Sequence, residues 1–346
     1  MSTRLARLRK RLEEPLLITN LVNISYLTGF ESSNAALLVP PSGQVRLFTD
    51  FRYFDAACEV PEVKAVLTKR SLLSELAGKL KGRLGFEADA LPYSQHAVLA
   101  SGGLELVART GLVEGLRAVK DADEIEKLRR VALVAERAFE ALTAEPWIGH
   151  SEREIAWRMR QLLHAHGTDE FSFETAIAAG PNGALPHAAP GDHTIALGTL
   201  VVADWGARLG GYCSDCTRTL STGEPPKELE RIYEVCLEAQ LAAVAGIRPG
   251  MTGAEADRIA RDVIEEAGYG ERFGHGLGHG VGVAIHEAPR LSTESSDVLE
   301  VGNVVTIEPG IYLPGLGGVR IEDLAVVTET GVELLTSFPK DLITVN

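Results

Sequence analysis

The feature that most constrains the fold is a repeat in the second part of the sequence. Ser151-x-x-Glu154 and Thr252-x-x-Glu255 are both capping boxes, in which a hydroxyl and a glutamate satisfy the first backbone N–H groups of a helix. The helices that they open are predicted to end near Gly167 and Gly268, so both ends are separated by the same 101 positions. Another predicted helix precedes each one and strand-like runs follow it. The pattern predicts a duplicated unit with a pseudo-twofold axis.

Carboxylates stand at matched places on the strands that are predicted to follow each helix pair. Asp204 and Glu308 each end an apolar run, and the next predicted strand in each half brings in Asp215 or Glu322. Related by the pseudo-twofold axis, the two pairs are expected to converge. Burying even one isolated carboxylate costs on the order of several kcal/mol, and like charges raise that cost. Four converging carboxylates therefore predict bound cations.

A glycine- and histidine-rich stretch, Gly274–Glu287, contains candidate nitrogen ligands for a metal ion. It holds five glycines and the three histidines His275, His279 and His286, which predicts a shaped loop with close backbone approach. A metal site, a set of oxyanion donors and a structural turn all fit such a stretch, and the spacing of the histidines favours a functional site. Four carboxylates with one imidazole suit two divalent ions, and oxygen-rich ligation favours Mn, Co, Fe or Zn.

The composition limits the function classes. The chain has 346 residues, 45% of them hydrophobic, which is enough for a sizeable core and suggests two domains. A formal net charge of −14 argues against nucleic-acid binding, and no apolar run is long enough to predict a membrane span. Residues 4–14 are predicted to form an amphipathic helix and not a signal peptide. We expect a cytoplasmic protein.

The four cysteines are scattered along the chain, which fits a reduced enzyme better than a disulfide scaffold. Cys213-x-x-Cys216 has a spacing that can bind zinc, but it lies in a predicted strand, residues 212–220. Strand alternation would place the two thiols on opposite faces, so we do not expect them to share a metal.

The first third of the chain predicts a separate α/β domain. Short apolar runs bounded by turn formers predict strands at Leu16–Ile18, Ala35–Val39 and Val45–Thr49, and another at 83–86. Residues 51–58 and 72–81 are predicted to be helical. No nucleophile arrangement or phosphate-binding loop is visible here. The domain boundary is expected near residue 118, which gives an N-terminal domain of residues 1–118 and a C-terminal domain of residues 119–346.

Several segments together resemble the pita-bread metallopeptidases, most closely the Xaa-Pro dipeptidases (prolidases) and aminopeptidase P. Residues 24–30 resemble the N-terminal domain of the same proteins, so the resemblance covers the whole chain. It implies an α+β protein, with an N-terminal creatinase/prolidase-type domain and a C-terminal pita-bread domain. The segments of the C-terminal domain that carry the resemblance are Asp204–Gly206, Ser214–Thr219, Gly274–Glu287, Thr306–Tyr312 and Gly318–Asp323.

The resemblance implies a dinuclear metal centre, with manganese expected first and cobalt, zinc or iron as alternatives. Asp215 and Glu322 would bridge the ions, Asp204 would chelate one of them, and His279 and Glu308 would complete the other. Glu308 would also shuttle a proton from the attacking water to the leaving proline nitrogen. His275 and His286 would lie near the developing oxyanion and the substrate backbone, with His187 facing them as a third catalytic candidate. Arg320 could orient a metal-bound carboxylate, Tyr312 could support the centre or contact the substrate, and Arg290 could bind the substrate.

The favoured function is hydrolysis of Xaa-Pro dipeptides by a cytoplasmic homodimer. Aminopeptidase P, which acts on longer peptides, is the nearest alternative, methionine aminopeptidase a weaker one, and a non-catalytic pita-bread binding protein the alternative from another class. Arg290 bears on substrate length, because a guanidinium can bind the free carboxylate of a dipeptide. A structural salt bridge from Arg290 to Glu287 or Glu294 is the competing interpretation.

Overall fold

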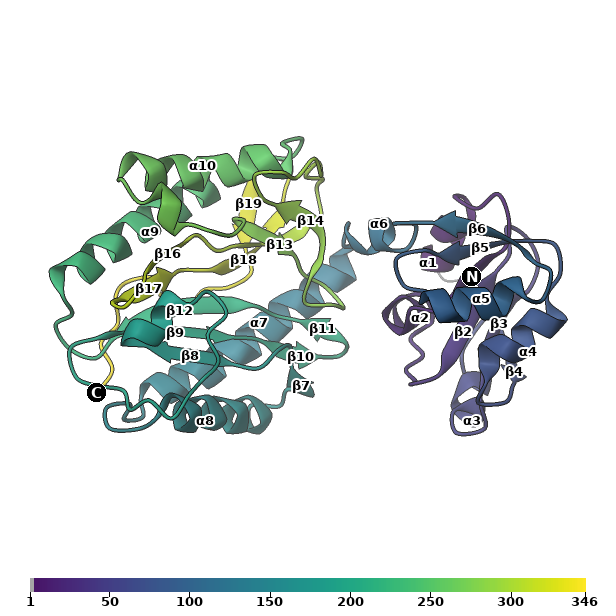
Figure 1. Ribbon diagram of the computed structural model, residues 1–346, viewed down its shortest axis with the longest axis horizontal. Coiled ribbons are helices and arrows are strands. Elements are labelled where there is room, and N and C mark those ends of the chain that lie inside the picture. Colours follow the sequence, from purple (N-terminus) through teal and green to yellow (C-terminus); the bar gives the residue numbers. More distant parts are fainter. Residues whose placement is uncertain (1–2) are drawn as a thin grey trace. The chain divides into compact units, whose positions relative to one another are not determined.

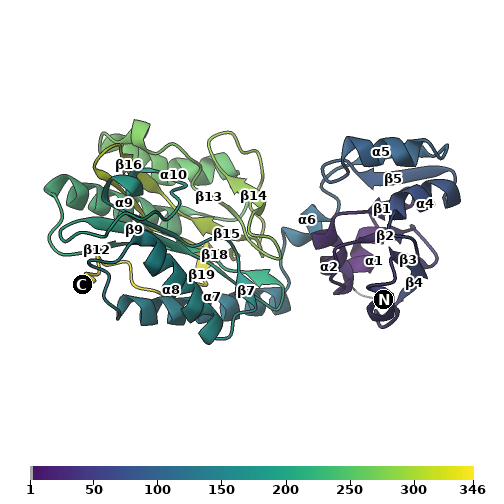
Figure 2. The same ribbon diagram turned by 60° about the horizontal axis from the view of Figure 1, so that its bottom comes forward.

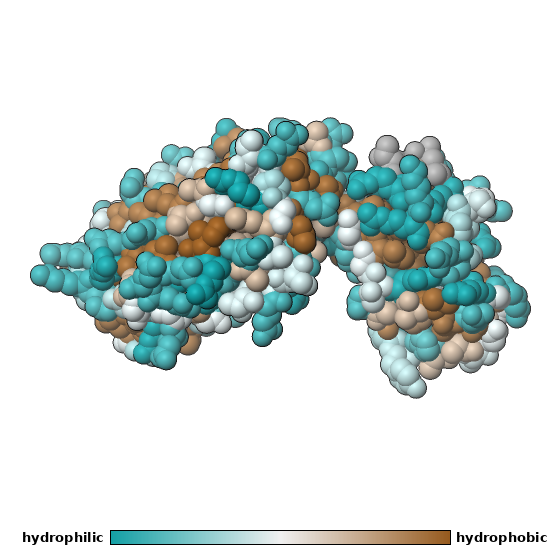
Figure 3. Space-filling model, turned by 90° about the horizontal axis from the view of Figure 1, so that it is seen from above, coloured by the Kyte–Doolittle hydropathy of each residue, from teal (hydrophilic) through white to brown (hydrophobic). Residues whose placement is uncertain are grey.

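The computed structural model describes residues 3–346, which divide into two compact units (Figure 1). One unit runs up to Arg117, and the other runs from Ala118 to the C-terminus. Among the described residues, no helix has both the length and the apolar character needed to cross a bilayer. Hydrophilic and hydrophobic residues intermingle on the face that Figure 3 shows.

The first unit is built on a six-stranded mixed sheet in the order β4-β3-β2-β1-β5-β6. β2 runs antiparallel to its neighbours β1 and β3, and all other neighbouring pairs are parallel, so β2 runs opposite to the other five strands of the sheet. The strands are β1 Leu16–Ile18, β2 Ala35–Val39, β3 Val45–Thr49, β4 Val63–Leu67, β5 Arg83–Glu87 and β6 Glu105–Arg109. The helices are α1 Thr3–Arg9, α2 Leu21–Thr28, α3 Phe54–Cys58, α4 Leu72–Lys79, α5 Tyr93–Ala100 and α6 Glu114–Arg117.

The first three predicted strands have the observed bounds, whereas the first helix is shorter than predicted. It ends at Arg9, and Leu5 and Leu8 fill the core, while Leu12 lies beyond the helix end with its N–H donating to Arg9 O at 3.2 Å. The sequence patterns did not predict α2, β4, α5, α6 and β6. α2 carried recognisable signals, since the Asn20 side chain caps its first turn and Gly29 ends it with a φ of 72°.

The second unit contains two helix pairs on opposite sides of its strands, as the two views in Figures 1 and 2 agree. The capping boxes predicted at Ser151 and Thr252 are both present. Their helices end next to Gly167 and Gly268, which have φ angles of 92° and 88°. The helix pairs are α7 Ala122–Thr143 with α8 Glu152–Ala165, and α9 Lys227–Gly246 with α10 Gly253–Glu266.

Each helix pair packs mainly on the strands of its own half, and α7 also packs through Leu128 on strands of the second half. In the first half the sheet order is β12-β9-β8, and in the second it is β14-β13-β15-β18-β19. The first-half elements are β7 Glu170–Phe171, β8 Ala176–Ala179, the 3-10 helix η1 Gly180–Ala184, β9 Leu200–Trp205, β10 Ala207–Leu209, β11 Tyr212–Cys213 and β12 Cys216–Ser221. The second-half elements are the 3-10 helix η2 Gly270–Arg272, β13 Gly278–Gly280, β14 Glu287–Leu291, β15 Val304–Ile307, β16 Gly310–Leu313, β17 Gly317–Arg320, β18 Asp323–Val327 and β19 Val332–Leu334.

Two apolar cores fix the helices on the strands. In the first half Phe139 of α7 stacks on Trp205 of β9, with ring centroids 3.6 Å apart, and Phe338 packs edge-on against both rings. In the second half Ile232 and Ala260 belong to a buried cluster with residues of β15 and β17. The strands β9, β15 and β17 are therefore held in place by the helices that pack on them.

The strand predicted at 212–220 is interrupted. β11 pairs with β10 and β12 pairs with β9, so Cys213 and Cys216 lie on strands of different sheets. Ser214 and Asp215 connect the two strands, and the Ser214 N–H donates to Ala207 O at 2.8 Å. The interruption leaves Asp215 in an irregular segment instead of in a regular strand. All four cysteines are free thiols, and three of them are buried.

Candidate metal centre

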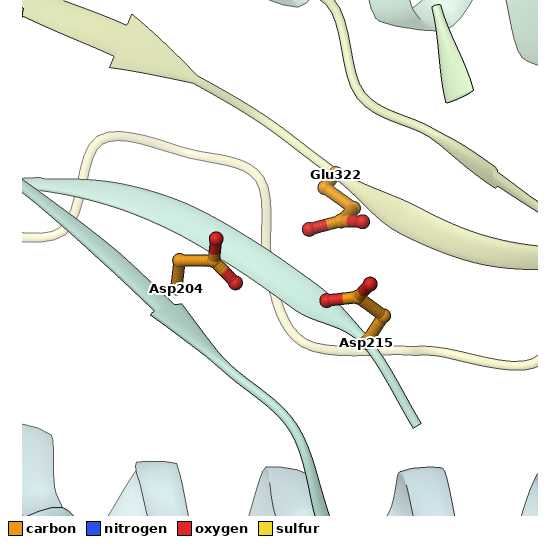
Figure 4. Close-up of side chains that lie close together, drawn as sticks. All are labelled: Asp204, Asp215 and Glu322. Carbon is orange, nitrogen blue, oxygen red and sulfur yellow. The ribbon is translucent and has the colours of Figure 1, made fainter. Parts of the chain in front are cut away.

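Three carboxylates converge in the middle of the second unit. One oxygen each from Asp204, Asp215 and Glu322 lies within 4.8 Å of the other two, and Figure 4 shows the side chains pointing toward one another. Asp204 comes from β9, Asp215 precedes β12, and Glu322 joins β17 to β18. Burial raises the pKa of Asp215 well above its usual range, and the charges of Glu322 and Asp204 raise it further. Without a cation, this cluster therefore disfavours its ionised state.

His279 links this cluster to a fourth carboxylate. Its Nε2 lies 3.6 Å from Asp215 Oδ2 and 3.4 Å from Glu308 Oε1. His279 Nδ1 lies 3.1 Å from Gly280 O, which accepts a hydrogen bond, so the proton sits on Nδ1 and the Nε2 lone pair faces the carboxylates. Burial lowers the pKa of His279 and keeps the ring neutral. A neutral imidazole with a free Nε2 is the form that binds a metal.

Glu308 is held by a threonine on the same face of the same chain segment. Thr306 Oγ1 donates to Glu308 Oε1 at 2.9 Å and accepts from His279 N at 3.0 Å. Thr217 holds Glu322 in the same way, by donating to its Oε2 at 2.6 Å. The sequence analysis missed both threonines. Strand alternation could have found Thr306, which lies two residues before Glu308.

The arrangement fits a metal centre. Asp204 Oδ1 is buried and has no hydrogen-bond partner in the part of the chain that the structure describes. A buried unpaired carboxylate oxygen is costly unless a cation is beside it. Four carboxylates and one imidazole form an oxygen-rich donor set, which suits divalent ions such as Mn, Co, Fe or Zn and not thiolate-seeking metals. The structure brings together all five residues that the sequence analysis nominated as ligands.

Arg320 orients the carboxylate of Asp204 from the protein side. Its Nη2 donates to Asp204 Oδ2 at 2.7 Å, and its Nε donates to Thr217 Oγ1 at 3.1 Å. Its Nη1 donates to Tyr312 Oη at 2.9 Å and to Pro186 O at 3.1 Å. The guanidinium is buried, and its hydrogen bonds hold these four acceptor groups in place at once.

Tyr312 connects Arg320 to His275 through hydrogen bonds. The His275 Nε2 and Tyr312 Oη atoms are 2.9 Å apart, and His275 Nδ1 lies 2.8 Å from Gly276 O. Since a carbonyl oxygen only accepts, the hydrogen-bond network assigns the His275 proton to Nδ1 and makes Nε2 the acceptor of the tyrosine O–H. Burial lowers the pKa of His275 and raises that of Tyr312 to about 12, so both groups are neutral near pH 7.

His286 and His187 lie beside this centre with open ring nitrogens. The His286 and His279 rings are in edge contact, with centroids 4.4 Å apart. Partial burial lowers the pKa of His286, and the neighbouring His279 and His187 rings lower it further. His187 is exposed, on the segment that follows η1. No described residue forms a hydrogen bond with the ring nitrogens of either His286 or His187.

Arg290 lies on β14, directly opposite His279 of β13. Neither acid that we considered as its salt-bridge partner plays that role. Glu287 instead forms a buried ion pair with Lys120 at 3.2 Å, and within residues 3–346 the Arg290 guanidinium has no ion pair. The side chain is exposed. The salt-bridge interpretation of Arg290 is therefore wrong in this structure.

The glycines of the Gly274–Glu287 stretch allow close strand approach, and part of the stretch is the strand β13, not a loop. A Cβ atom on Gly278 would lie 2.0 Å from Thr306 O, and one on Gly280 would lie 2.3 Å from Ala288 O. Neither glycine has a positive φ. The glycines therefore let His279 approach Glu308 across the sheet.

Comparisons with known proteins identify the family of both units. Residues 126–329 match the model of metallopeptidase family M24, and residues 4–119 match the creatinase/prolidase N-terminal domain. The chain belongs to metallopeptidase family M24.

Among its relatives, the Xaa-Pro dipeptidase of Pyrococcus furiosus is 38% identical over 351 residues, covering 99% of this chain and 100% of that protein. The solved Xaa-Pro dipeptidase from Bacillus anthracis has a TM-score of 0.95 and 40% identity, covering 99% of both chains. An X-Pro aminopeptidase from Thermotoga maritima has a TM-score of 0.89 and 33% identity, covering 98% of this chain and 100% of that one. The family and the architecture that the sequence predicted are confirmed.

Proposed function

We propose that the chain is a metal-dependent exopeptidase that hydrolyses Xaa-Pro dipeptides. The observation that carries the proposal is the buried cluster of Asp204, Asp215 and Glu322, which His279 links to Glu308. The dipeptidases among its relatives, which match nearly the whole chain, support the same activity. Manganese as the physiological metal, a homodimer and a cytoplasmic location belong to the same proposal.

Five side chains would hold the two divalent ions. The resemblance to the pita-bread metallopeptidases supports Asp215 and Glu322 as the ligands that the ions would share, and Asp215 lies near both Asp204 and His279. When bound, two such ions lower the pKa of a water molecule and polarise the scissile carbonyl. Asp204, Asp215, His279, Glu308 and Glu322 are the proposed ligands.

Glu308 is the proposed proton carrier. Only its Oε1 is engaged by Thr306, and burial raises the pKa of its carboxyl group, which favours accepting a proton. The carboxylate takes a proton from the attacking water and later donates it to the leaving nitrogen. In an Xaa-Pro bond this nitrogen carries no N–H and its ring fixes φ, so a peptidase that must bind an N–H at this position is excluded.

The histidines divide into two roles. Both ring nitrogens of His275 are engaged, so His275 holds Tyr312 and, through it, Arg320. His286 and His187 have ring nitrogens available, and they are the proposed donors to the developing oxyanion and to the substrate backbone. This assignment separates His275 from the other two, which the sequence had grouped together.

We expect two divalent ions per chain. The five-residue donor set, with two carboxylates placed for sharing, exceeds the needs of one ion. Elemental analysis after dialysis and reconstitution with Mn or Co measures the stoichiometry. Thermal unfolding with and without metal provides a second readout, because a ligand that binds only the folded state raises the melting temperature. A metal content near zero together with chelator-resistant activity would refute the metallopeptidase proposal.

Arg290→Ala is expected to raise KM for Xaa-Pro dipeptides roughly 10- to 100-fold, the value of a hydrogen bond to a charged group. The exposed guanidinium lies opposite His279 and is free to bind the proline carboxylate of a dipeptide. Tripeptides of the form Xaa-Pro-Xaa should be affected little. Arg290→Lys is the matched control, since it keeps the charge but loses the bidentate fork.

Initial rates with Ala-Pro, Gly-Pro and Xaa-Pro-Xaa peptides on the metal-loaded protein test the function directly. Aminopeptidase P activity is the second candidate, favoured by the similarity to the Thermotoga maritima X-Pro aminopeptidase. A preference of the unmodified enzyme for tripeptides, or equal losses on both substrates in Arg290→Ala, would assign the chain to that activity.

A further inference from the structure

Glu152, the first residue of α8, is a carboxylate that the metal centre does not use. Its side chain is completely buried. Its Oε1 accepts from Ala179 N at 2.7 Å, and its Oε2 accepts from Asn182 Nδ2 and from Gly191 N, both at 2.8 Å. All three donors belong to one segment, residues 179–191, which begins at the end of β8 and carries His187. One buried carboxylate therefore binds both ends of this segment.

Further hydrogen bonds hold the middle of the segment in place. Asn182 Nδ2 also donates to Ala189 O at 3.3 Å, so one amide connects Glu152 to both arms of the loop. On the side of the metal centre, Arg320 Nη1 donates to Pro186 O. The loop also lies tightly against β17, where a Cβ on Gly318 would be 2.1 Å from Gly183 O. Glu152 and Arg320 thus hold the loop at separate points.

The tip of the loop is exposed, although the residues on either side of the tip are buried. Ala184 and Ala188 are 7% and 8% exposed, whereas Leu185 between them is 58% exposed and His187 is exposed. An exposed tip on a fixed base can present a side chain to a substrate at a defined place.

A carboxylate is chemically required at position 152. Three N–H groups point at it, and glutamine could accept from some of them but would direct its own N–H groups at the rest. The start of α8 also favours negative charge. The equivalent position in the second half, 101 residues later, is Gly253, where a Cβ would lie 1.9 Å from Arg290 O. The carboxylate is therefore a feature of the first half alone and not a general requirement of the helix cap.

We propose that Glu152 is a positioning residue that fixes the 179–191 loop and thereby holds His187 against the substrate. This inference rests on the proposed function, because His187 is assigned there as a substrate contact. Glu152 does not touch the reacting atoms.

Glu152→Gln is the informative variant. We expect kcat/KM for Xaa-Pro substrates to fall by up to about 10²-fold, the scale of a misplacement of about 1 Å. Metal content should stay at the wild-type value, because none of the proposed ligands contacts Glu152. In a His187→Ala background the same substitution should cause little further loss, since the group that it positions is then missing. Glu154→Gln is the matched control on the same helix. The exposed Glu154 carboxylate accepts a hydrogen bond from Ser151 N and has no contact with the loop, so this variant should keep wild-type kinetics.

Hydrogen exchange provides a readout that is independent of activity. In Glu152→Gln the amides of residues 179–191 should exchange faster, while those of 304–323 should keep their protection. Unchanged exchange in the loop would overturn the proposal, as would full additivity of Glu152→Gln and His187→Ala. If His187→Ala alone had wild-type kinetics, the assigned role of His187 would fail, and faster loop exchange would then show that Glu152 fixes the loop without serving the reaction.

Discussion

Replacing Glu308 with glutamine is expected to lower kcat by at least about 10²–10⁴-fold, the contribution typical of a general acid–base group. The amide keeps an oxygen for the metal and can still accept from Thr306, but it cannot carry a proton. The fold should be unaffected, because the substitution preserves size and the contacts of the carbonyl oxygen. Single-turnover rates on Ala-Pro with the metal-loaded variant measure the effect.

The metal content of Glu308→Gln is the essential control. A variant that binds two ions and still fails to turn over separates proton transfer from metal binding. Thr306→Val tests the same carboxylate from the other side, because it removes the hydrogen bond to Oε1 and leaves the acid in place. The decrease in kcat should be much smaller for Thr306→Val than for Glu308→Gln. A kcat near the wild-type value in Glu308→Gln would mean that another group moves the proton.

Arg218→Met is expected to lower the free energy of unfolding by about 3–5 kcal/mol, the cost of breaking a buried ion pair. Arg218 and Asp323 are almost fully buried, and their atoms Nη2 and Oδ1 are 2.8 Å apart. The guanidinium also donates to the main-chain oxygens of Pro339, Thr217 and Glu322. Methionine removes all of these donors, so the buried Glu322 loses the guanidinium partner of its main-chain oxygen, and Asp323 keeps Lys340 as its cationic partner.

Denaturant unfolding followed by tryptophan fluorescence measures this loss, since all three tryptophans lie in the second unit. Arg129→Met is the matched control, because Arg129 pairs with Glu333 at 2.7 Å on the exposed surface. Exposed pairs contribute about 0–1 kcal/mol. Equal losses in the two variants would show that the buried network is not a stabilising feature. Weaker metal binding in Arg218→Met is also expected, because Arg218 holds the main chain of Glu322.

The parts of the fold that the sequence predicted depend on local chemistry. The capping boxes at Ser151 and Thr252 and their glycine ends set the bounds of α8 and α10 without help from the rest of the chain. Strand-end carboxylates at Asp204 and Glu308 could be recognised for the same reason, because each follows an apolar run that a buried sheet requires. These features need only neighbours in sequence.

The parts that were missed depend on residues far apart in the chain. Lys120 and Glu287 are separated by 167 positions, and only the folded structure shows that Glu287 pairs with Lys120 and not with Arg290. The break at Ser214 and Asp215 follows from β11 and β12 pairing with different strands, which periodicity along the sequence cannot show. The engagement of both His275 nitrogens likewise depends on Tyr312, which the fold brings to it.

The division of the proposed ligands between the two halves has a consequence for the ancestry of the chain. Asp204 and Asp215 come from one half, and Glu308 and Glu322 come from the other, so neither half alone holds a complete set. A half-length ancestor would have formed the centre only where two identical chains met. Identical chains would have supplied identical ligands, whereas His279 comes from one half only. Joining the two halves in one chain permits this asymmetry, because each half can then change independently of the other.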